Sequence, residues 1–166
     1  MKSKIKICLT EEAQVILPQL GIDPNKYTPA YNGESTGLDL YNMGPELIIL
    51  GRNKWSVYGE QQVEVPTGIR IKIPENCVGL IKDRGSIVKS GLITRAGVID
   101  PGYMGEIFVY FVNVGERDTK ITPGAKLPVQ LIVVECNNSY ETVTYSDYVS
   151  DFSSSNRKEN KVGSTD

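Results

Sequence analysis

Apolar residues recur at every second position along much of this 166-residue chain. Ile69, Ile71 and Ile73 form one such set. Two further sets are Ile5, Ile7 and Leu9 near the start of the chain, and Val129, Leu131 and Val133 near its end. A period of two places the members of a set on one face of a β-strand. Each set therefore predicts a half-buried strand.

Short turn signals lie between these strands and favour an all-β fold of many short strands, as in a sandwich, jelly roll or barrel. The signals combine Pro with Gly or Asn in the segments 65–68, 73–76, 100–102 and 122–124. Very little helix is expected, because only Glu11 to Leu17 and Ser86 to Lys89 could form a turn or two. No internal repeat is present.

Composition indicates one domain followed by a short tail. A chain of this length with 40% hydrophobic residues can bury a sizeable core, and we assign residues 1–150 to a single β domain. From Asp151 the chain is rich in Ser, Asn, Lys and Glu, which cannot form a core. We therefore expect 151–166 to be a flexible C-terminal arm.

Charge and hydropathy exclude several classes of protein. The formal net charge is -2 and no basic block is present, so we expect no nucleic-acid partner. No run of apolar residues is long enough for a membrane span, and the alternating N-terminus is not a signal peptide. Three widely spaced cysteines suit a reducing compartment. The expectation is a soluble protein of the cytoplasm or another intracellular compartment.

Histidine is absent, so catalysis would depend on carboxylates, hydroxyls and a bound cation. Four segments combine Gly with such polar residues: Ser35 to Leu40, Asp83 to Leu92, Ala96 to Glu106 and Pro123 to Leu131. Their order and spacing, followed by Arg157 to Asp166, resemble the five signature motifs of the trimeric dUTP pyrophosphatases. Gly-Val-Ile-Asp followed by Tyr and Gly in the third segment is the most specific part.

The resemblance implies a fold, an activity and an assembly. The fold would be a jelly-roll-like β barrel, and the assembly a homotrimer. The activity would be hydrolysis of dUTP to dUMP and pyrophosphate, which limits uracil in DNA and supplies dUMP for thymidylate synthesis.

Asp100 is the first candidate for catalysis. An Asp before Pro-Gly often caps its own turn. The resemblance gives Asp100 a second role, because an ionised carboxylate can orient and deprotonate a water for attack on the α-phosphorus. The backbone of Gly97, Val98 and Ile99 would read uracil. The Tyr103 ring would lie under the deoxyribose, where a 2'-hydroxyl has no room.

Arg84, Gly85 and Ser86 would bind the phosphates through a guanidinium, a backbone amide and a hydroxyl. The family has Ser where this chain has Gly85, so one hydroxyl is lost. Gln130 of the fourth segment would also contact the substrate. An extra residue within Leu127-Pro128-Val129 shifts the approach to this glutamine, and a strand proline belongs at an edge or a bulge.

The cofactor implied by the resemblance is Mg2+. A small hard cation of this kind binds mainly through the triphosphate and water, without a dedicated protein cage. Asp39 would act on the metal indirectly, through a bound water.

In the family the C-terminal arm closes over the site of a neighbouring subunit. Here Arg157 and Gly163 stand at matching positions. Val162 replaces the aromatic residue that stacks on uracil, and such stacking is worth roughly 1–3 kcal/mol per base. A looser lid over an intact core site is the expectation.

Two other functions compete with dUTP hydrolysis. A sister family on the same fold deaminates dCTP with a glutamate on the strand after the third motif, where this chain has Tyr110. The second alternative is a catalytically weak or silent relative that binds nucleotide or a protein partner. Gly85, the extra residue near Pro128, and Val162 are the features that favour this alternative.

Overall fold

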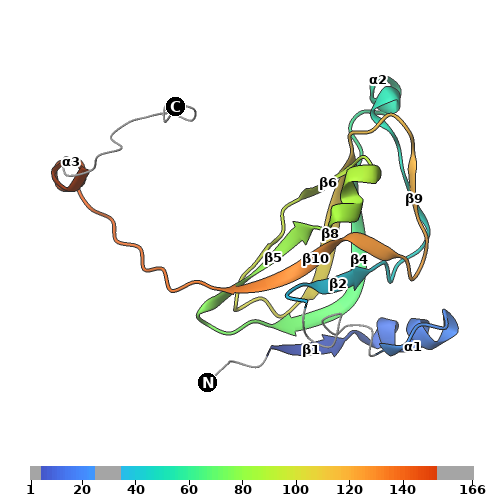
Figure 1. The fold of residues 1–166 in the computed structure, drawn as a ribbon, viewed down its shortest axis with the longest axis horizontal. Coiled ribbons are helices and arrows are strands. Elements are labelled where there is room, and N and C mark those ends of the chain that lie inside the picture. Colours follow the sequence, from blue (N-terminus) through green and yellow to red (C-terminus); the bar gives the residue numbers. More distant parts are fainter. Residues whose placement is uncertain (1–4, 25–34, 153–166) are drawn as a thin grey trace. The chain divides into compact units, whose positions relative to one another are not determined.

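The computed structural model describes residues 5–24 and 35–152. Figure 1 shows the fold and labels most of its elements. The strands are β1 (Lys6–Leu9), β2 (Leu38–Tyr41), β3 (Leu47–Ile49), β4 (Gln62–Lys72), β5 (Cys77–Asp83), β6 (Leu92–Arg95), β7 (Val98–Ile99), β8 (Glu106–Asn113), β9 (Thr119–Ile121) and β10 (Lys126–Glu135). The helices are α1 (Glu11–Gln19), α2 (Trp55–Tyr58) and α3 (Tyr145–Phe152), with 3-10 turns η3 (Arg52–Lys54) and η4 (Gly85–Lys89).

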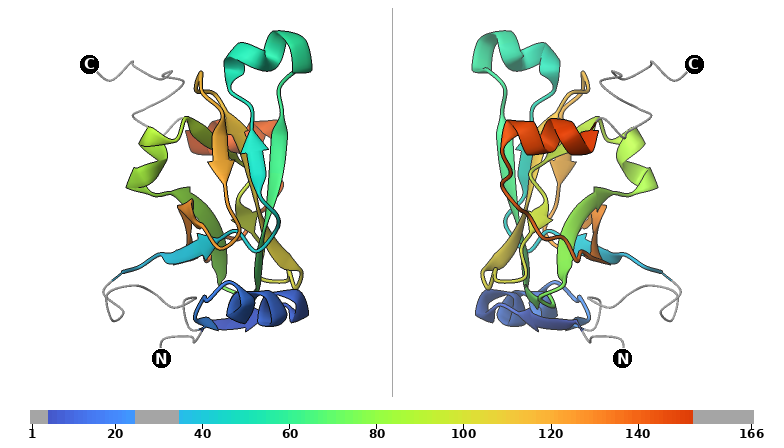
Figure 2. Two further views of the ribbon diagram at one scale, coloured as in Figure 1. Left: turned by 90° about the vertical axis from the view of Figure 1, so that its right-hand side faces the viewer. Right: turned by 90° about the vertical axis from the view of Figure 1, so that its left-hand side faces the viewer.

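Two four-stranded antiparallel sheets carry the fold. Sheet A has the order β1-β4-β8-β6, and sheet B has the order β2-β10-β5-β7. A separate ribbon pairs β3 with β9. Figure 2 shows the same strands from two sides. In sheet B, β2 and β7 are the two edge strands, and β10 and β5 lie between them.

One hydrophobic core receives side chains from both sheets. Val65 and Phe111 enter it from sheet A, and Leu40, Val129 and Leu131 enter it from sheet B. The alternating set at Ile69, Ile71 and Ile73 is also buried in this core. The prediction of an all-β fold built from short strands is confirmed, and the arrangement is compatible with a jelly roll.

The first predicted strand is present, but its apolar face is open. Ile5 and Ile7 are 44% and 37% exposed, while Leu9 packs against the core. Among the described strands, β1 lies at the edge of sheet A and pairs only with β4. Its edge position accounts for the difference, because within residues 5–24 and 35–152 no second strand pairs with its outer side.

An irregularity in β4 shapes the start of β8, which becomes a wall of the site. Between Pro66 and Arg70 the pairing of β4 with β8 shifts register. Thr67 Oγ1 donates to the Ile107 carbonyl at 2.6 Å, and the Gly68 amide donates to Glu106 Oε1 at 2.8 Å. These bonds hold the first residues of β8 although the regular ladder is interrupted there.

The observed helices agree only in part with those predicted from the sequence. α1 begins as predicted and extends to Gln19, with Thr10 Oγ1 accepting from the Ala13 amide at 3.2 Å. The predicted turn after Arg84 is the 3-10 turn η4. Sequence patterns did not indicate η3, α2 or α3. Each is a short element of eight residues or fewer, and a period of 3.6 is hard to recognise over so few positions.

Contacts divide the chain into two units, Met1–Cys136 and Asn137–Asp166. The described part of the second unit contains α3, and Thr144 Oγ1 accepts from the Asp147 amide at its start. The domain boundary expected after residue 150 falls within α3 and stays a prediction. Across the described residues, no helix combines the length and apolar character needed to cross a membrane.

Candidate active site

Asp39 is the centre of one polar cluster, although the residue is only 8% exposed. Its Oδ1 lies 3.0 Å from Arg84 Nε, and its Oδ2 accepts a hydrogen bond from Lys126 Nζ at 2.7 Å. Each carboxylate oxygen therefore contacts a different cation. We call Asp39, Arg84, Lys126 and Gln130 the phosphate cluster, for reasons that follow from its charge.

Strand register brings this cluster together. Asp39 on β2 lies opposite Gln130 on β10, which in turn lies opposite Lys82 on β5. The pairing of β10 with β2 is irregular between Lys126 and Gln130. Pro128 lies within that irregular stretch, and its carbonyl accepts from the Arg84 amide at 2.9 Å. The sequence indicated an edge or a bulge at this proline, and the pairing is irregular there, with Gln130 opposite Asp39 beyond the irregular stretch.

Gln130 packs over Gly37, just before β2. A Cβ atom added to Gly37 would lie 2.0 Å from Gln130 Oε1 and 2.7 Å from Gln130 Cδ. No real Cβ contact is that short, so the absence of a side chain at residue 37 is what allows the amide to reach this position. The glycine of the first signature segment therefore leaves room for the glutamine of the fourth in this position.

The charges of the cluster favour an anion. One carboxylate faces one guanidinium and one ammonium, which leaves a net positive charge. The hydrogen bond to Asp39 raises the pKa of Lys126 above its ordinary value. Lys126 also lies 5.7 Å from the centroid of the Tyr41 ring, a cation-π distance. Arg84 bonds Asp39 through Nε, and its terminal nitrogens remain able to grip a phosphate.

The loop after β5 presents the remaining groups predicted to bind phosphate. Arg84 is extended and precedes η4, and Gly85 and Ser86 are exposed. A Cβ at Gly85 would meet nothing within 4 Å, and its φ is not positive. Unlike Gly37, this glycine is not required by the backbone or by packing.

The second cluster is the hairpin that follows β6, at the other edge of sheet B. Ile99 and Val98 of β7 pair with Gly79 and Leu80 of β5. The Ile81 amide donates to the Gly97 carbonyl at 2.8 Å. Gly97 has a φ of 115°, which an L side chain rarely adopts, so the backbone of the hairpin depends on this glycine.

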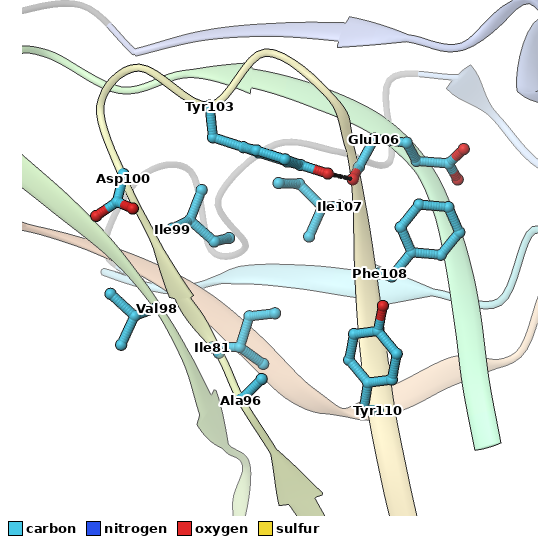
Figure 3. Close-up of a pocket in the computed structure, with 11 residues that line it drawn as sticks. Ile81, Ala96, Val98, Ile99, Asp100, Tyr103, Glu106, Ile107, Phe108 and Tyr110 are labelled. Atoms are coloured by element: carbon cyan, nitrogen blue, oxygen red, sulfur yellow. Dashed lines mark hydrogen bonds between the residues drawn. The ribbon is translucent and has the colours of Figure 1, made fainter. Parts of the chain in front are cut away.

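A pocket lies between this hairpin and β8. Figure 3 shows its lining residues, with Val98, Ile99 and Asp100 on the hairpin side and Phe108 and Tyr110 on the β8 side. We call it the hairpin pocket. The lining combines apolar side chains with a few polar ones, from Asp100, Tyr103, Glu106 and Tyr110, which is typical of a small-molecule site.

Tyr103 bridges the hairpin and β8. Its hydroxyl donates to the Glu106 carbonyl at 2.7 Å, which is the dashed line in Figure 3. A Cβ at Gly105 would lie 2.5 Å from the Tyr103 hydroxyl, so this glycine gives the phenol its space. The ring is 43% exposed, which leaves a face available to a ligand.

Asp100 stands at the tip of the hairpin, next to the pocket (Figure 3). The Tyr103 amide donates to the Asp100 backbone carbonyl at 3.0 Å and closes the turn. The side chain is exposed, and within residues 5–24 and 35–152 it accepts no hydrogen bond. Its carboxylate is therefore available to a ligand and does not cap the turn.

The two clusters are separate within one chain. Asp39 and Ile99 belong to the two edge strands of sheet B, three strand spacings apart. Asp39 is level with Lys82 on β5, because both residues lie opposite Gln130 of β10. Ile99 lies opposite Gly79 on β5. At about 4.8 Å per strand and about 3.3 Å per residue, their Cα atoms lie roughly 15–20 Å apart. The structure thus brings together Asp39, Arg84 and Gln130, but not Asp100 with them.

Lys126 is a member of the phosphate cluster that sequence reasoning missed. The available signal was weak, because a lysine at the start of a strand usually indicates a solvated position. Only its place in the fourth signature segment pointed to the site. Arg157, Val162 and Gly163 lie outside the described residues.

The described residues contain no group of three or more His, Cys, Asp or Glu side chains that could hold a metal ion. Asp39 is the single carboxylate of the phosphate cluster, and each of its oxygens already accepts from one cation. A carboxylate oxygen has a second lone-pair direction, so Asp39 can also accept from a water.

Comparison with known proteins identifies relatives along most of the chain. The family model described as dUTPase matches residues 27–166. The chain is 36% identical over 75 residues to the Pol polyprotein of equine infectious anemia virus (strain Wyoming), a match that covers 45% of this chain and 7% of the polyprotein. It is 30% identical over 142 residues to the deoxyuridine 5'-triphosphate nucleotidohydrolase of Orientia tsutsugamushi (strain Boryong), which covers 82% of this chain and 86% of that protein.

Solved structures share the fold. The native dUTPase of equine infectious anemia virus aligns with a TM-score of 0.61 and 24% identity, covering 86% of this chain and 98% of that one. A variant dUTPase of phage phi11 of S. aureus, solved with a structural Mg(II) ion, aligns with a TM-score of 0.63 and 17% identity, covering 86% and 97%. At these identities the likeness shows the fold alone.

The packing of Gln130 on Gly37 leads to a prediction about stability. We expect Gly37→Ala to lower the free energy of unfolding by about 1–3 kcal/mol, because the added methyl group overlaps the Gln130 amide. Gly85→Ala, where the space is open, is the matched control. Urea unfolding measures both.

Combining Gly37→Ala with Gln130→Ala should recover much of the loss, because the overlapping amide is then absent. Additive losses in this double-mutant cycle would show that the two residues do not interact.

Proposed function

We propose that this chain, which belongs to the dUTPase family, hydrolyses dUTP to dUMP and pyrophosphate, and so limits uracil in DNA and supplies dUMP for thymidylate synthesis. The observation that carries the proposal is the hairpin with an unengaged Asp100 carboxylate at its tip, beside a largely apolar pocket. A cationic cluster elsewhere on the chain supplies what a triphosphate requires.

The hairpin pocket would hold the deoxyuridine. The backbone of Gly97, Val98 and Ile99 lies along one wall and would read the polar edge of uracil. The Tyr103 ring would lie under the sugar, with its hydroxyl fixed on the Glu106 carbonyl. A ring held in this way leaves no space for a 2'-hydroxyl, so ribonucleotides are disfavoured.

Asp100 would act as the general base. Its exposed carboxylate can accept a proton from a water and direct the oxygen at the α-phosphorus. The new bond forms between that oxygen and the α-phosphorus, and the bond to the bridging oxygen of the β-phosphate breaks. Pyrophosphate leaves, and dUMP remains.

The phosphate cluster would bind the triphosphate. The free nitrogens of Arg84, the Gly85 amide and the Ser86 hydroxyl offer charge-assisted and neutral hydrogen bonds. Lys126 adds a second cation, and Gln130 adds an amide beside Asp39. These donors stabilise negative charge as it moves onto the leaving pyrophosphate.

The cofactor would be Mg2+, bound mainly through the triphosphate and water. The residues fit this arrangement, because each Asp39 oxygen has a lone pair left for a metal-bound water. When bound, the metal neutralises phosphate charge and polarises the phosphorus–oxygen bonds.

The working form would be a homotrimer. Asp39, at the centre of the phosphate cluster, and the hairpin that carries Asp100 belong to opposite edge strands of sheet B, so we infer that a single chain does not hold the whole substrate. A cyclic assembly can place the hairpin pocket of one copy against the phosphate cluster of the next. The arm with Arg157, Val162 and Gly163 would then close over the completed site.

An intracellular, reducing location suits this protein. Cys8, Cys77 and Cys136 form no disulfide, although all three belong to the described chain. We therefore place the enzyme in the cytoplasm or another intracellular compartment.

No observation favours deamination of dCTP. Tyr110 occupies the position where the sister family has a catalytic glutamate, and its hydroxyl donates to Glu64 Oε2 at 2.6 Å. A phenol engaged in this way does not replace a carboxylate base. A catalytically silent protein is likewise not favoured, because Asp100 and the phosphate cluster are both in place.

One assay tests the proposed function. The full chain is incubated with dUTP or dCTP and Mg2+, and pyrophosphate and ammonia are measured. We expect pyrophosphate from dUTP, and a loss of about a hundredfold or more in kcat in Asp100→Asn, which keeps the shape but removes the base. Ammonia from dCTP would indicate a deaminase instead, and binding of dUMP without any product would indicate a silent relative.

Restoring a family hydroxyl should raise activity. We expect Gly85→Ser to increase kcat for dUTP about tenfold, because the serine adds a phosphate contact in open space. Gly85→Ala is the control, since it adds a methyl group without a hydroxyl. Equal activity in the two variants would show that a hydroxyl at residue 85 makes no productive contact with the phosphates.

A further inference from the structure

Lys82 is an exposed lysine on β5 that lies level with the phosphate cluster. It is directly opposite Gln130 on β10, and Gln130 is directly opposite Asp39 on β2. Directly opposite residues of an antiparallel sheet carry their side chains on the same face, with Cβ atoms about 4.5–5.5 Å apart. Asp39, Gln130 and Lys82 therefore form one row across sheet B.

The neighbouring row shows which face of the sheet this is. Leu38, Leu131 and Ile81 are paired in the same way, one residue along each strand, and all three are buried in the core. Successive side chains of a strand point to opposite faces of the sheet. The row that contains Lys82 therefore points away from the core.

Arg84 lies on the same face as Lys82. It follows Lys82 by two residues, and its backbone is extended, with φ -93° and ψ 158°. Its amide donates to the Pro128 carbonyl at 2.9 Å, so β10 still holds the chain at this point. Residues two apart in an extended chain are separated by about 6.6 Å. The long, flexible Lys82 side chain can thus reach an anion held by Arg84 and Gln130.

The Lys82 ammonium has no anionic partner within residues 5–24 and 35–152. Each oxygen of Asp39 already contacts another cation of the phosphate cluster. Asp83, the next residue, belongs to the opposite face by alternation, and its carboxylate accepts from Thr94 Oγ1 on β6 at 3.2 Å. The full charge of Lys82 is therefore available to a ligand.

We propose that Lys82 is a further substrate-binding residue, which contacts the phosphates of dUTP beside Arg84 and Gln130 and selects for the triphosphate. This inference rests on the proposed function. Where the family has a serine hydroxyl, this chain has Gly85, and a lysine on the neighbouring strand face offers three donors and a full charge. A ligand with more phosphate charge gains more from that ammonium, so its effect increases from dUMP to dUTP.

The test measures the binding of two ligands to the full-length protein by calorimetry in the presence of Mg2+. One ligand is dUMP. The other is a dUTP analogue with nitrogen in place of the oxygen between the α- and β-phosphates, which resists hydrolysis. We expect Lys82→Gln to weaken binding of the analogue about tenfold and binding of dUMP by less than about threefold. Added salt should weaken binding of the analogue less in this variant than in wild type, because one ionic contact is missing.

Two further variants separate a phosphate contact from a general effect of charge. Lys82→Arg keeps the positive charge and should bind the analogue within about twofold of wild type. Lys72→Gln removes an exposed lysine of β4, opposite Lys6 in sheet A, that also forms no ion pair within the described part of the chain. This matched control should leave both affinities unchanged.

Unchanged affinity for the analogue in Lys82→Gln, with dUTP still hydrolysed, would overturn the inference and leave the proposed function standing. Equal losses for dUMP and the analogue, or equal losses in Lys82→Gln and Lys72→Gln, would overturn it as well. Wild-type protein that binds neither ligand and releases no pyrophosphate from dUTP would overturn the proposed function itself.

Discussion

The buried carboxylate of Asp39 joins three segments that are distant in the sequence. It lies on β2, and its two oxygens contact Arg84 from the loop after β5 and Lys126 at the start of β10. Loss of either cation would leave this largely buried carboxylate with a single cationic partner. The same arrangement leaves the cluster with a net positive charge. Asp39 therefore both organises the cluster and directs it toward an anion.

Register makes this arrangement possible. β10 carries one more residue before Gln130 than the family pattern allows, and a one-residue slip would turn the glutamine to the other face of the sheet. The irregular pairing around Pro128 takes up the extra length, and Gln130 remains opposite Asp39. Gly37 then leaves room for its amide. The strand thus accommodates the extra residue near Pro128 and keeps Gln130 opposite Asp39.

Much of the fold could be predicted because it depends on local alternation. Ile69, Ile71 and Ile73 are buried as their period of two indicated, and α1 begins where the pattern placed it. The open face of Ile5 and Ile7 could not be predicted, since edge position is a property of the whole sheet. The same limit applies to Lys126. Its role depends on a partner 87 residues away, and no local pattern records that contact.

Under the proposed function, the separation of Asp100 from the phosphate cluster makes the assembly part of the mechanism. The most direct test mixes two full-length variants, Asp100→Asn and Arg84→Gln, each with one defective half of the site. Co-expressed with different tags and purified through both tags in succession, the mixed cyclic trimers should regain about one third of wild-type dUTP hydrolysis, because each ring contains one intact site of three, although each variant alone is inactive. Mixed oligomers with no more activity than the separate variants, or a wild-type monomer with full activity, would contradict the account.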